Sequence, residues 1–174
     1  MNIPTREECL ELLCNYKVPE HIQNHCKTVN KVAVFLAKKL KEKGVDINVE
    51  LVDAASLLHD VGRTGEKEQY PNPRHLEEGY NRLKDKYPEV ADTIRVHGLL
   101  LLDKAETWEQ KLVNYADKRA WEHEIVSLQK RISSIERRYE FTFPEENKQK
   151  YFELEKQIFD IIELEPDELG EYVE

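Results

Sequence analysis

Apolar residues recur at helical spacing along most of the chain, and this period limits the folds open to it. The clearest stretch has apolar residues at spacings of four, three and four: Val29, Ala33, Leu36 and Leu40. Such spacing places them on one face of a helix. The six glycines and seven prolines fall mostly between such segments, where they end helices. We therefore expect an all-α fold, and 174 residues are enough for one domain with one core.

Turn residues and capping signals divide the chain into segments. Thr5 and, three residues later, Glu8 form a capping box that opens a first short helix, and Gly62 is the expected C-terminal cap of the third. The first expected helix ends near 17–19. The helices expected after it cover 19–44, 48–61, 75–87, 89–102, 107–135 (one long helix or two joined end to end) and 151–161. The expected organisation is an N-terminal helix at 1–18, a core at 19–140, and a C-terminal helix with an acidic tail at 141–174 packed on that core.

Charge and targeting signals narrow the classes of partner. Acidic residues outnumber basic ones by 35 to 26, for a net charge of -9, which opposes binding to a nucleic-acid backbone. The chain has no apolar run near twenty residues and no signal peptide, so we expect a cytoplasmic protein with no membrane partner. Cys9, Cys14 and Cys26 are odd in number and lack Cys-x-x-Cys spacing, which predicts buried free thiols.

Polar residues interrupt the apolar faces of several predicted helices. Five side chains fall on or beside inward faces: His25, His59, Asp60, His97 and Asp117. Buried carboxylates need neutralising partners. For any one of them the commonest explanation is a core histidine bonded to an aspartate. Five such polar side chains on four helices favour a bound divalent metal ion, because imidazole nitrogen and carboxylate oxygen are ordinary metal ligands.

The adjacent pair His59-Asp60 has a geometric use at the end of a helix. Neighbouring helical side chains point about 100° apart. His59 is therefore expected to bind one ion while Asp60 bridges toward a second ion or holds a water.

The order of these residues resembles a known family. His25, the His59-Asp60 doublet and Asp117 look like the signature of the HD superfamily of metal-dependent phosphohydrolases. The phrases that carry the resemblance span roughly residues 19 to 120 and are "HCKTVNKVAVFLAKKL", "AASLLHDVGR", "HLEEGY" and "LVNYADKR". The resemblance implies a single-domain HD-type helical bundle with additional C-terminal helices.

The same resemblance implies a set of metal ligands. A first ion would be held by His25, His59, Asp60 and Asp117, with Asp60 bridging, and a second by His75 and His97. Many dinuclear members carry two consecutive histidines at the later position, whereas this chain has His97-Gly98, so one ion or two stay open. The expected metal is Fe, Mn, Zn, Ni, Co or Mg. The alternative for His75 is an exposed residue at the start of a helix.

Ions held by this set would supply hydroxide near neutral pH for in-line attack on phosphorus. The sequence therefore predicts a phosphohydrolase that cleaves a phosphoester or phosphoanhydride of a nucleotide. An acidic protein needs cations near the metals to attract a polyanion. Besides Asp60, the expected catalytic residues are Arg63 and Lys118. In the family that the chain resembles, a basic residue at the place of Arg63 commonly contacts phosphate. The alternative for both Arg63 and Lys118 is a charge solvated at the surface. Weaker candidates, chosen for proximity, are Lys67, Arg74 and Arg119.

The substrate stays open between a nucleoside monophosphate, a dinucleoside polyphosphate and a cyclic mononucleotide. The loop at 64–74 and the helical region after Asp117 are the expected walls of its pocket. The chain lacks the "HHE" and "GYP" phrases of cyclic-dinucleotide phosphodiesterases. His21 lies on the face of His25 but is expected at the surface, as is His123.

Two other classes remain open. The domain could bind a nucleotide or metal as a catalytically inactive sensor, which metal content and activity would decide. It could also be a helical scaffold that uses the stripe of apolar residues at 125–135, although that stripe is too short for a coiled coil. This helix or the last one could also support a homodimer.

Overall fold

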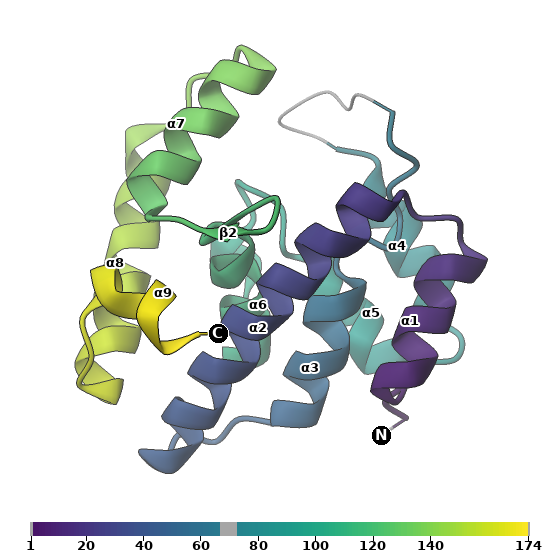
Figure 1. The fold of residues 1–174 in the computed structure, drawn as a ribbon, viewed down its shortest axis with the longest axis horizontal. Helices are drawn as coiled ribbons and strands as arrows, with labels where there is room; N and C mark the ends of the chain where they lie inside the picture. The colour runs from purple at the N-terminus through teal and green to yellow at the C-terminus, as the bar shows by residue number, and fades with distance from the viewer. Residues whose placement is uncertain (1, 67–72, 174) are drawn as a thin grey trace.

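The computed structural model describes residues 2–66 and 73–173 and shows a helical bundle with one small hairpin (Figure 1). The all-α fold is confirmed. The elements are α1 (Arg6–Asn15), α2 (Glu20–Glu42), α3 (Val49–Leu58), α4 (His75–Leu83), α5 (Pro88–Arg95), η1 (Leu102–Lys104), α6 (Trp108–Asp117), β1 (Ala120–Trp121), β2 (Glu124–Ile125), α7 (Leu128–Tyr139), α8 (Glu145–Ile162), η2 (Pro166–Glu168) and α9 (Leu169–Tyr172). Lys67 and most of the loop at 64–74 lie outside the described residues.

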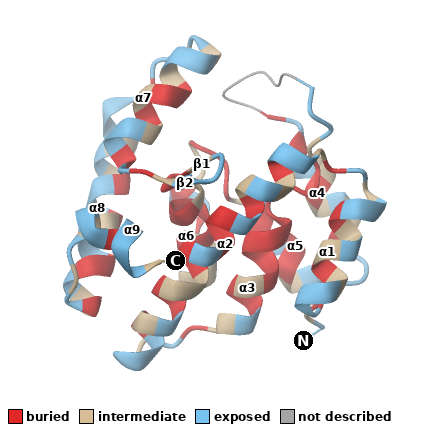
Figure 2. Ribbon diagram, in the orientation of Figure 1, coloured by how far each residue is buried: buried red, intermediate tan, exposed pale blue. Residues whose placement is uncertain are grey.

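The long helix α2 crosses the middle of the bundle and packs against α3, α6 and α8 (Figure 1). The four apolar residues whose spacing predicted this helix are completely buried, and burial of one such aliphatic side chain stabilises a fold by about 1.5–3 kcal/mol. In Figure 2, α3, α5 and α6 are largely buried, whereas α7 and α8 carry both buried and exposed residues. The core therefore lies around α2, with the C-terminal helices covering one side.

Side-chain caps fix where several helices begin. The predicted capping box of Thr5 and Glu8 is present at α1. Asn48 caps α3 and Ser127 caps α7, each by accepting hydrogen bonds from backbone N–H groups of the first turn. Each such cap contributes about 1 kcal/mol.

The prediction over 107–135, one long helix or two joined end to end, is wrong in both forms. The helix α6 ends at Asp117, and the antiparallel hairpin of β1 and β2 follows before α7 begins at Leu128. Glu122 in the hairpin turn has a left-handed φ of 55°, which no α-helix accommodates. Because of this break, α7 stands to one side of the bundle (Figure 1).

The helix expected to reach Leu102 ends early, at Arg95. The side-chain amide of Asn114, completely buried on α6, donates to the carbonyls of Val96 at 2.7 Å and Gly98 at 3.3 Å. The carbonyl of Val96 is thereby satisfied by a side chain and not by a further helical turn, and that of Gly98 also accepts from the N–H of Leu101 at 3.0 Å. The segment after α5 is consequently an irregular turn held against α6.

The prediction of buried thiols holds for Cys9 and Cys26 and is wrong for Cys14, which is exposed. Leu13 is the completely buried residue of this turn of α1. Cys14 follows it by one position, about 100° around the helix, and therefore faces solvent.

Arg119, a weak phosphate candidate from the sequence, has a structural position. Its buried guanidinium donates to the carbonyls of Val126 at 2.7 Å and Pro166 at 2.8 Å, and to the carboxylate of Glu155 at 2.8 Å. The hydroxyl of Tyr115 also lies 2.6 Å from it and donates to Glu155 at 2.5 Å. The network joins the hairpin, α8 and the C-terminal residues to the end of α6.

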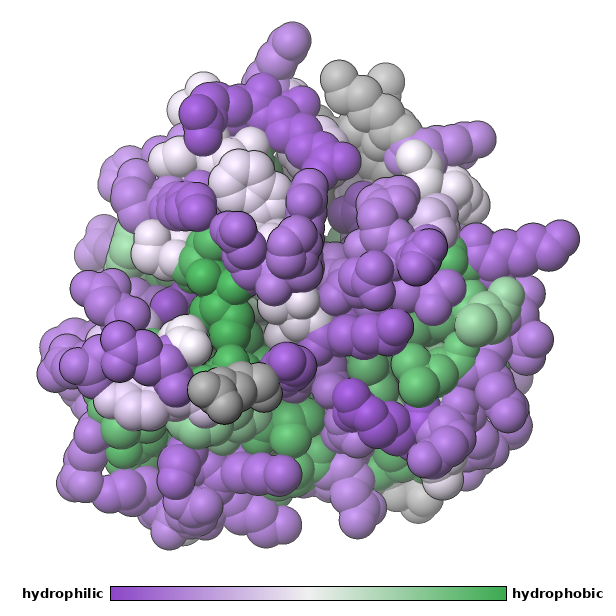
Figure 3. Space-filling model, viewed as in Figure 1, coloured by the Kyte–Doolittle hydropathy of each residue, from purple (hydrophilic) through white to green (hydrophobic). Residues whose placement is uncertain are grey.

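The surface in Figure 3 is largely hydrophilic, and apolar side chains reach it in a strip between the C-terminal helices and α2. Within residues 2–66 and 73–173, no helix combines the length and the apolar character needed to cross a membrane. The division at residues 18 and 140 and a homodimer formed through α7 or α8 stay predictions.

Candidate metal centre

Five segments of the chain bring the predicted metal ligands together. Their positions are His25 in α2, His59 and Asp60 directly after α3, His75 at the start of α4, His97 after α5, and Asp117 at the end of α6. Helix ends and turns therefore supply most of the cluster.

The doublet lies in a turn and not, as predicted, in the last turn of a helix. The helix α3 ends at Leu58, and His59 is its C-cap. The N–H of Val61 donates to the carbonyl of Leu58, and that of Arg63 to the carbonyl of Asp60, both at 2.9 Å. These three-residue hydrogen bonds wind the backbone more tightly than an α-helix and turn the doublet toward α4 and α6.

Gly62 is not the left-handed helix cap that the sequence predicted, because its φ is not positive. It is instead a point of close approach between the doublet turn and α4. A Cβ at this position would lie 2.2 Å from the carbonyl oxygen of His75 and 2.6 Å from the nitrogen of Gly79. Only a glycine permits that contact, which brings His75 within reach of Asp60.

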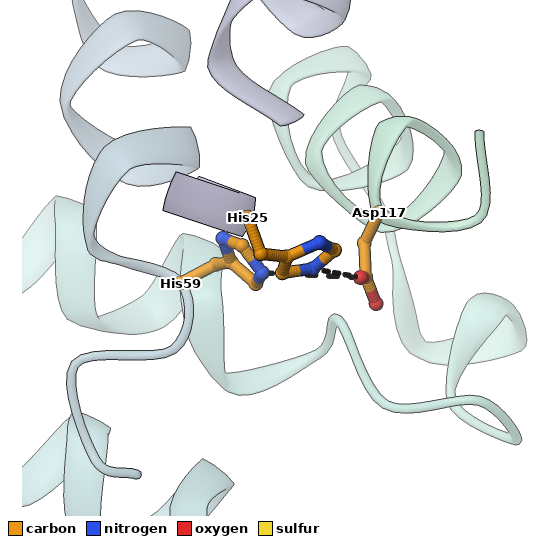
Figure 4. A group of neighbouring side chains, drawn as sticks. All are labelled: His25, His59 and Asp117. Atoms are coloured by element: carbon orange, nitrogen blue, oxygen red, sulfur yellow. Dashed lines mark hydrogen bonds and ion pairs between the residues drawn. The ribbon is translucent and has the colours of Figure 1, made fainter. Parts of the chain in front are cut away.

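His25, His59 and Asp117 form the first group of candidate ligands. Their side chains converge from three segments (Figure 4), and their ligand atoms all lie within 4.8 Å of one another. Nε2 of His25 is 2.9 Å, and Nε2 of His59 is 3.9 Å, from Oδ1 of Asp117. This spacing suits atoms that share one ion.

Asp60, His75 and His97 form a second group beside the first. Oδ1 of Asp60 lies 3.3 Å from Nε2 of His75 and 3.5 Å from Nε2 of His97. The other carboxylate oxygen, Oδ2, lies 3.7 Å from Nε2 of His59. Asp60 thus stands between the two groups, where the sequence expected a bridging ligand. His75 is buried, so its alternative as an exposed residue is wrong.

Hydrogen bonds to backbone carbonyls orient two of the imidazoles. Nδ1 of His59 lies 2.8 Å from the carbonyl oxygen of Ser56, and Nδ1 of His97 lies 2.5 Å from that of Ile94. A carbonyl only accepts, so each Nδ1 carries the proton and each Nε2 presents a lone pair. Metal-binding histidines are oriented by this kind of bond.

Burial and charge set the protonation of the cluster. Burial lowers the pKa of His59 to about 3, against the opposing effect of the neighbouring carboxylates. Burial would raise the pKa of Asp60 and Asp117, but Arg63 and Lys118 respectively, together with nearby imidazoles, hold both well below the usual range. Neutral imidazoles and ionised carboxylates are the forms that bind metals.

The two predicted phosphate contacts, Arg63 and Lys118, both contact ligand carboxylates. Nε of Arg63 lies 2.8 Å from Oδ1 of Asp60. Nζ of Lys118 lies 2.5 Å from Oδ2 of Asp117 and donates to the carbonyl of His97 at 3.0 Å. Burial lowers the pKa of Lys118, and Asp117 opposes that change. Lys118 is nearly inaccessible to solvent at 3% exposure, so its ammonium group is confined to these contacts.

A cavity of about 930 Å³ opens onto the cluster and is lined by residues that sequence reasoning missed. Trp121 from the hairpin and Arg131 and Arg138 from α7 contribute to its wall. The predicted wall after Asp117 is present, although it is a hairpin followed by a separate helix. No sequence signal singled out Arg131, because the stripe at 125–135 concerns only the apolar residues of the same helix.

Of the remaining predicted residues, some line this cavity and one lies elsewhere on the surface. His21 and His123 are exposed, as expected, and both also line the cavity. Arg74, a weak phosphate candidate, is exposed on the surface and pairs with Glu66 at 3.3 Å.

The residues fit a divalent metal. Nε2 of His59 is buried and accepts no hydrogen bond from any described residue, which is costly unless another partner binds it. Nε2 of His75 lies 3.1 Å from Nε2 of His97, so two imidazole nitrogens face one another. Imidazole nitrogens and carboxylate oxygens in this number suit Zn, Fe, Mn or a related ion.

An all-α bundle with a histidine and aspartate cluster of this kind is a fold that could hold a metal ion. A family model of the HD domain matches residues 22–122, more than half of the 174-residue chain. The chain belongs to the HD-domain superfamily of metal-dependent phosphohydrolases.

Curated relatives resemble parts of the chain. A tRNA (cytidine(56)-2'-O)-methyltransferase of Thermoplasma volcanium is 47% identical over 62 residues, covering 36% of this chain and 17% of the relative. An enzyme of the same name from Picrophilus torridus is 29% identical over 150 residues, covering 77% and 41%. An uncharacterized protein of Methanocaldococcus jannaschii is 41% identical over 58 residues, covering 33% and 34%. The chain spans less than half the length of each. No solved structure matches it.

Proposed function

We propose that the chain is a metal-dependent phosphohydrolase that cleaves a phosphoester or phosphoanhydride of a nucleotide. The observation that carries this proposal is the position of Asp60, an ionised and buried carboxylate between two groups of imidazole ligands. Its placement supports a centre for two ions over a centre for one.

The ligand set divides between two ions. His25, His59 and Asp117, together with Asp60, would hold the first. Asp60, His75 and His97 would hold the second. Divalent ions in such a site lower the pKa of a coordinated water and neutralise phosphoryl oxygens. The metal is one of Fe, Mn, Zn, Ni, Co and Mg, whose ligand preferences these residues meet to differing degrees.

The surrounding cations have separate tasks. Lys118 orients Asp117 and the segment of His97 through its ammonium group. Arg63 is partly exposed at 19% of its side chain and lines the cavity. Its guanidinium can therefore contact both Asp60 and a phosphoryl oxygen, a bidentate use for which arginine is suited. We propose Arg63 as a catalytic residue and Lys118 as a positioning residue.

A nucleotide suits the cavity by size and lining. Ligand pockets for small molecules range over about 300–1,000 Å³, and this one is about 930 Å³. It offers an aromatic ring at Trp121 and cationic groups at Arg131 and Arg138. Methyl transfer, in the name of two relatives, requires no activated water, so the cluster gives a chemical reason for hydrolysis.

Removal of the metal tests the proposal. Protein treated with a strong chelator is expected to lose at least about 99% of its phosphate release from a panel of nucleotides, because water without a metal has a pKa near 15.7. Addition of Mn²⁺ or Fe²⁺ alone should restore it. Phosphate release is measured in parallel with metal content and circular dichroism.

Two outcomes argue against hydrolysis at this site. Unchanged activity in metal-free protein would separate the reaction from the cluster. Metal-loaded protein that binds nucleotides but hydrolyses none of them would favour the sensor hypothesis.

A further inference from the structure

One face of α7 forms the wall of the cavity opposite α2. Arg131, Ser134 and Arg138 lie at spacings of three and four residues and all line the cavity, as expected for one face of a helix. The helix lies beyond residues 22–122, where the family model matches. The residues of this wall are therefore features of the chain outside the matched domain.

The positively charged side chains that line the cavity differ in how closely each is paired with a carboxylate. Arg63 and Lys118 contact ligand carboxylates at 2.8 and 2.5 Å. Arg131 is 3.8 Å from Asp117, and its Nε is buried without a hydrogen-bond partner in the described part of the chain. Arg138 forms no ion pair with any residue that the structure describes; its guanidinium lies over the neighbouring ring of Tyr139. Two arginines on α7 are thus available to an anion.

The two arginines stand at different distances from the metal ligands. Arg131 adjoins Asp117, so it is within reach of a phosphate at the candidate metal centre. Arg138 follows seven residues later, a rise of about 10 Å along the helix. Phosphates that share a bridging oxygen are closer together than this. The spacing favours a ligand whose two anionic groups are separated by a further chemical unit.

Aromatic side chains supply a surface for that unit. Trp121 and Tyr139 both line the cavity. The ammonium group of Lys130, a residue of α7, lies 5.5 Å from the centre of the Trp121 ring. The Lys130 side chain therefore packs against that ring. Nucleobases stack on such aromatic side chains. A nucleoside between the two phosphates matches both the spacing and the lining.

We infer that α7 and the hairpin form a second phosphate subsite centred on Arg138. This inference rests on the proposed function. The substrate is a nucleotide that carries a second phosphate on the other side of its nucleoside from the reacting one. Both a nucleoside 3',5'-bisphosphate and the 5'-phosphorylated end of a dinucleotide have this chemistry.

The test compares adenosine 5'-monophosphate, adenosine 3',5'-bisphosphate and a 5'-phosphorylated dinucleotide of two adenosines joined by a 3',5'-phosphodiester. We expect metal-loaded protein to bind the two diphosphorylated ligands at least about tenfold more tightly than the monophosphate, the size of one charge-assisted hydrogen bond. Arg138→Gln should remove that preference, so that the three ligands bind with similar dissociation constants. Arg137→Gln is the matched control, because Arg137 is exposed on the adjacent position and does not line the cavity.

Dissociation constants from calorimetry and rates of phosphate release are measured separately. If no ligand is hydrolysed, the proposed function fails, while the ratio of dissociation constants still tests the subsite. Equal affinity for all three ligands, or a preference that persists in Arg138→Gln, would overturn it. A preference for the dinucleotide over the bisphosphate supports the subsite and identifies a strand end as the ligand; the reverse order supports it with a mononucleotide.

Discussion

Asp60→Ala is expected to abolish hydrolysis and to empty the metal centre while the protein stays helical. Asp60 is the carboxylate that lies within 4 Å of imidazole nitrogens of His59, His75 and His97. Its removal takes an anionic ligand from both groups, and without the bound metal the rate falls by more than about a thousandfold. The measurements are elemental analysis, phosphate release and circular dichroism on the same preparation.

The matched control for this substitution is Asp92→Ala. Asp92 is an exposed aspartate on α5, so its loss should change neither metal content nor rate. Asp60→Asn tests charge at constant shape and should also lose metal. Activity retained in Asp60→Ala would contradict the assignment of the site.

Glu155→Ala is expected to lower stability by about 3 kcal/mol, because it leaves the buried guanidinium of Arg119 without its counter-charge. The side chains of Arg119 and Glu155 are 3% and 15% exposed, so solvent compensates little of the loss. For a chain of this length, 1 kcal/mol corresponds to about 2–4 °C in Tm, and a decrease of about 6–12 °C should appear in thermal unfolding.

Glu153→Ala provides the comparison on the same helix. Glu153 is exposed and accepts a hydrogen bond from Gln149, and substitutions of this kind change stability by about 0.5 kcal/mol or less. Equal Tm values for Glu153→Ala and Glu155→Ala would mean that the network around Arg119 contributes nothing to stability.

Local signals in the sequence predicted much of the fold. The spacing of buried residues defined α2, and the capping box at Thr5 defined the start of α1. These features depend on residues within a few positions of one another. The family resemblance rested on the same kind of short pattern, around His25, the doublet and Asp117, and family membership is confirmed.

What the sequence missed depends on contacts between distant segments. The early end of α5 follows from Asn114, whose side-chain amide donates to the carbonyls of Val96 and Gly98, 18 and 16 residues before it in the chain. The role of Gly62 follows from the approach of α4, which no local pattern encodes. Arg131 and Arg138 reach the cavity because the hairpin after Asp117 redirects α7, whereas an unbroken helix would carry them elsewhere.

The metal content of the wild-type protein and of His97→Ala, purified without a chelator or a metal-binding tag, tests the central claim most directly. Elemental analysis should give about two ions per chain for the wild type and about one for His97→Ala, because Nε2 of His97 belongs to the second ligand group, with Asp60 and His75. His123→Ala, which alters an exposed histidine, should keep two ions. One ion in both the wild type and His97→Ala would contradict the dinuclear centre and leave His75 and His97 to contact the substrate; no ion after reconstitution would contradict the metal site itself.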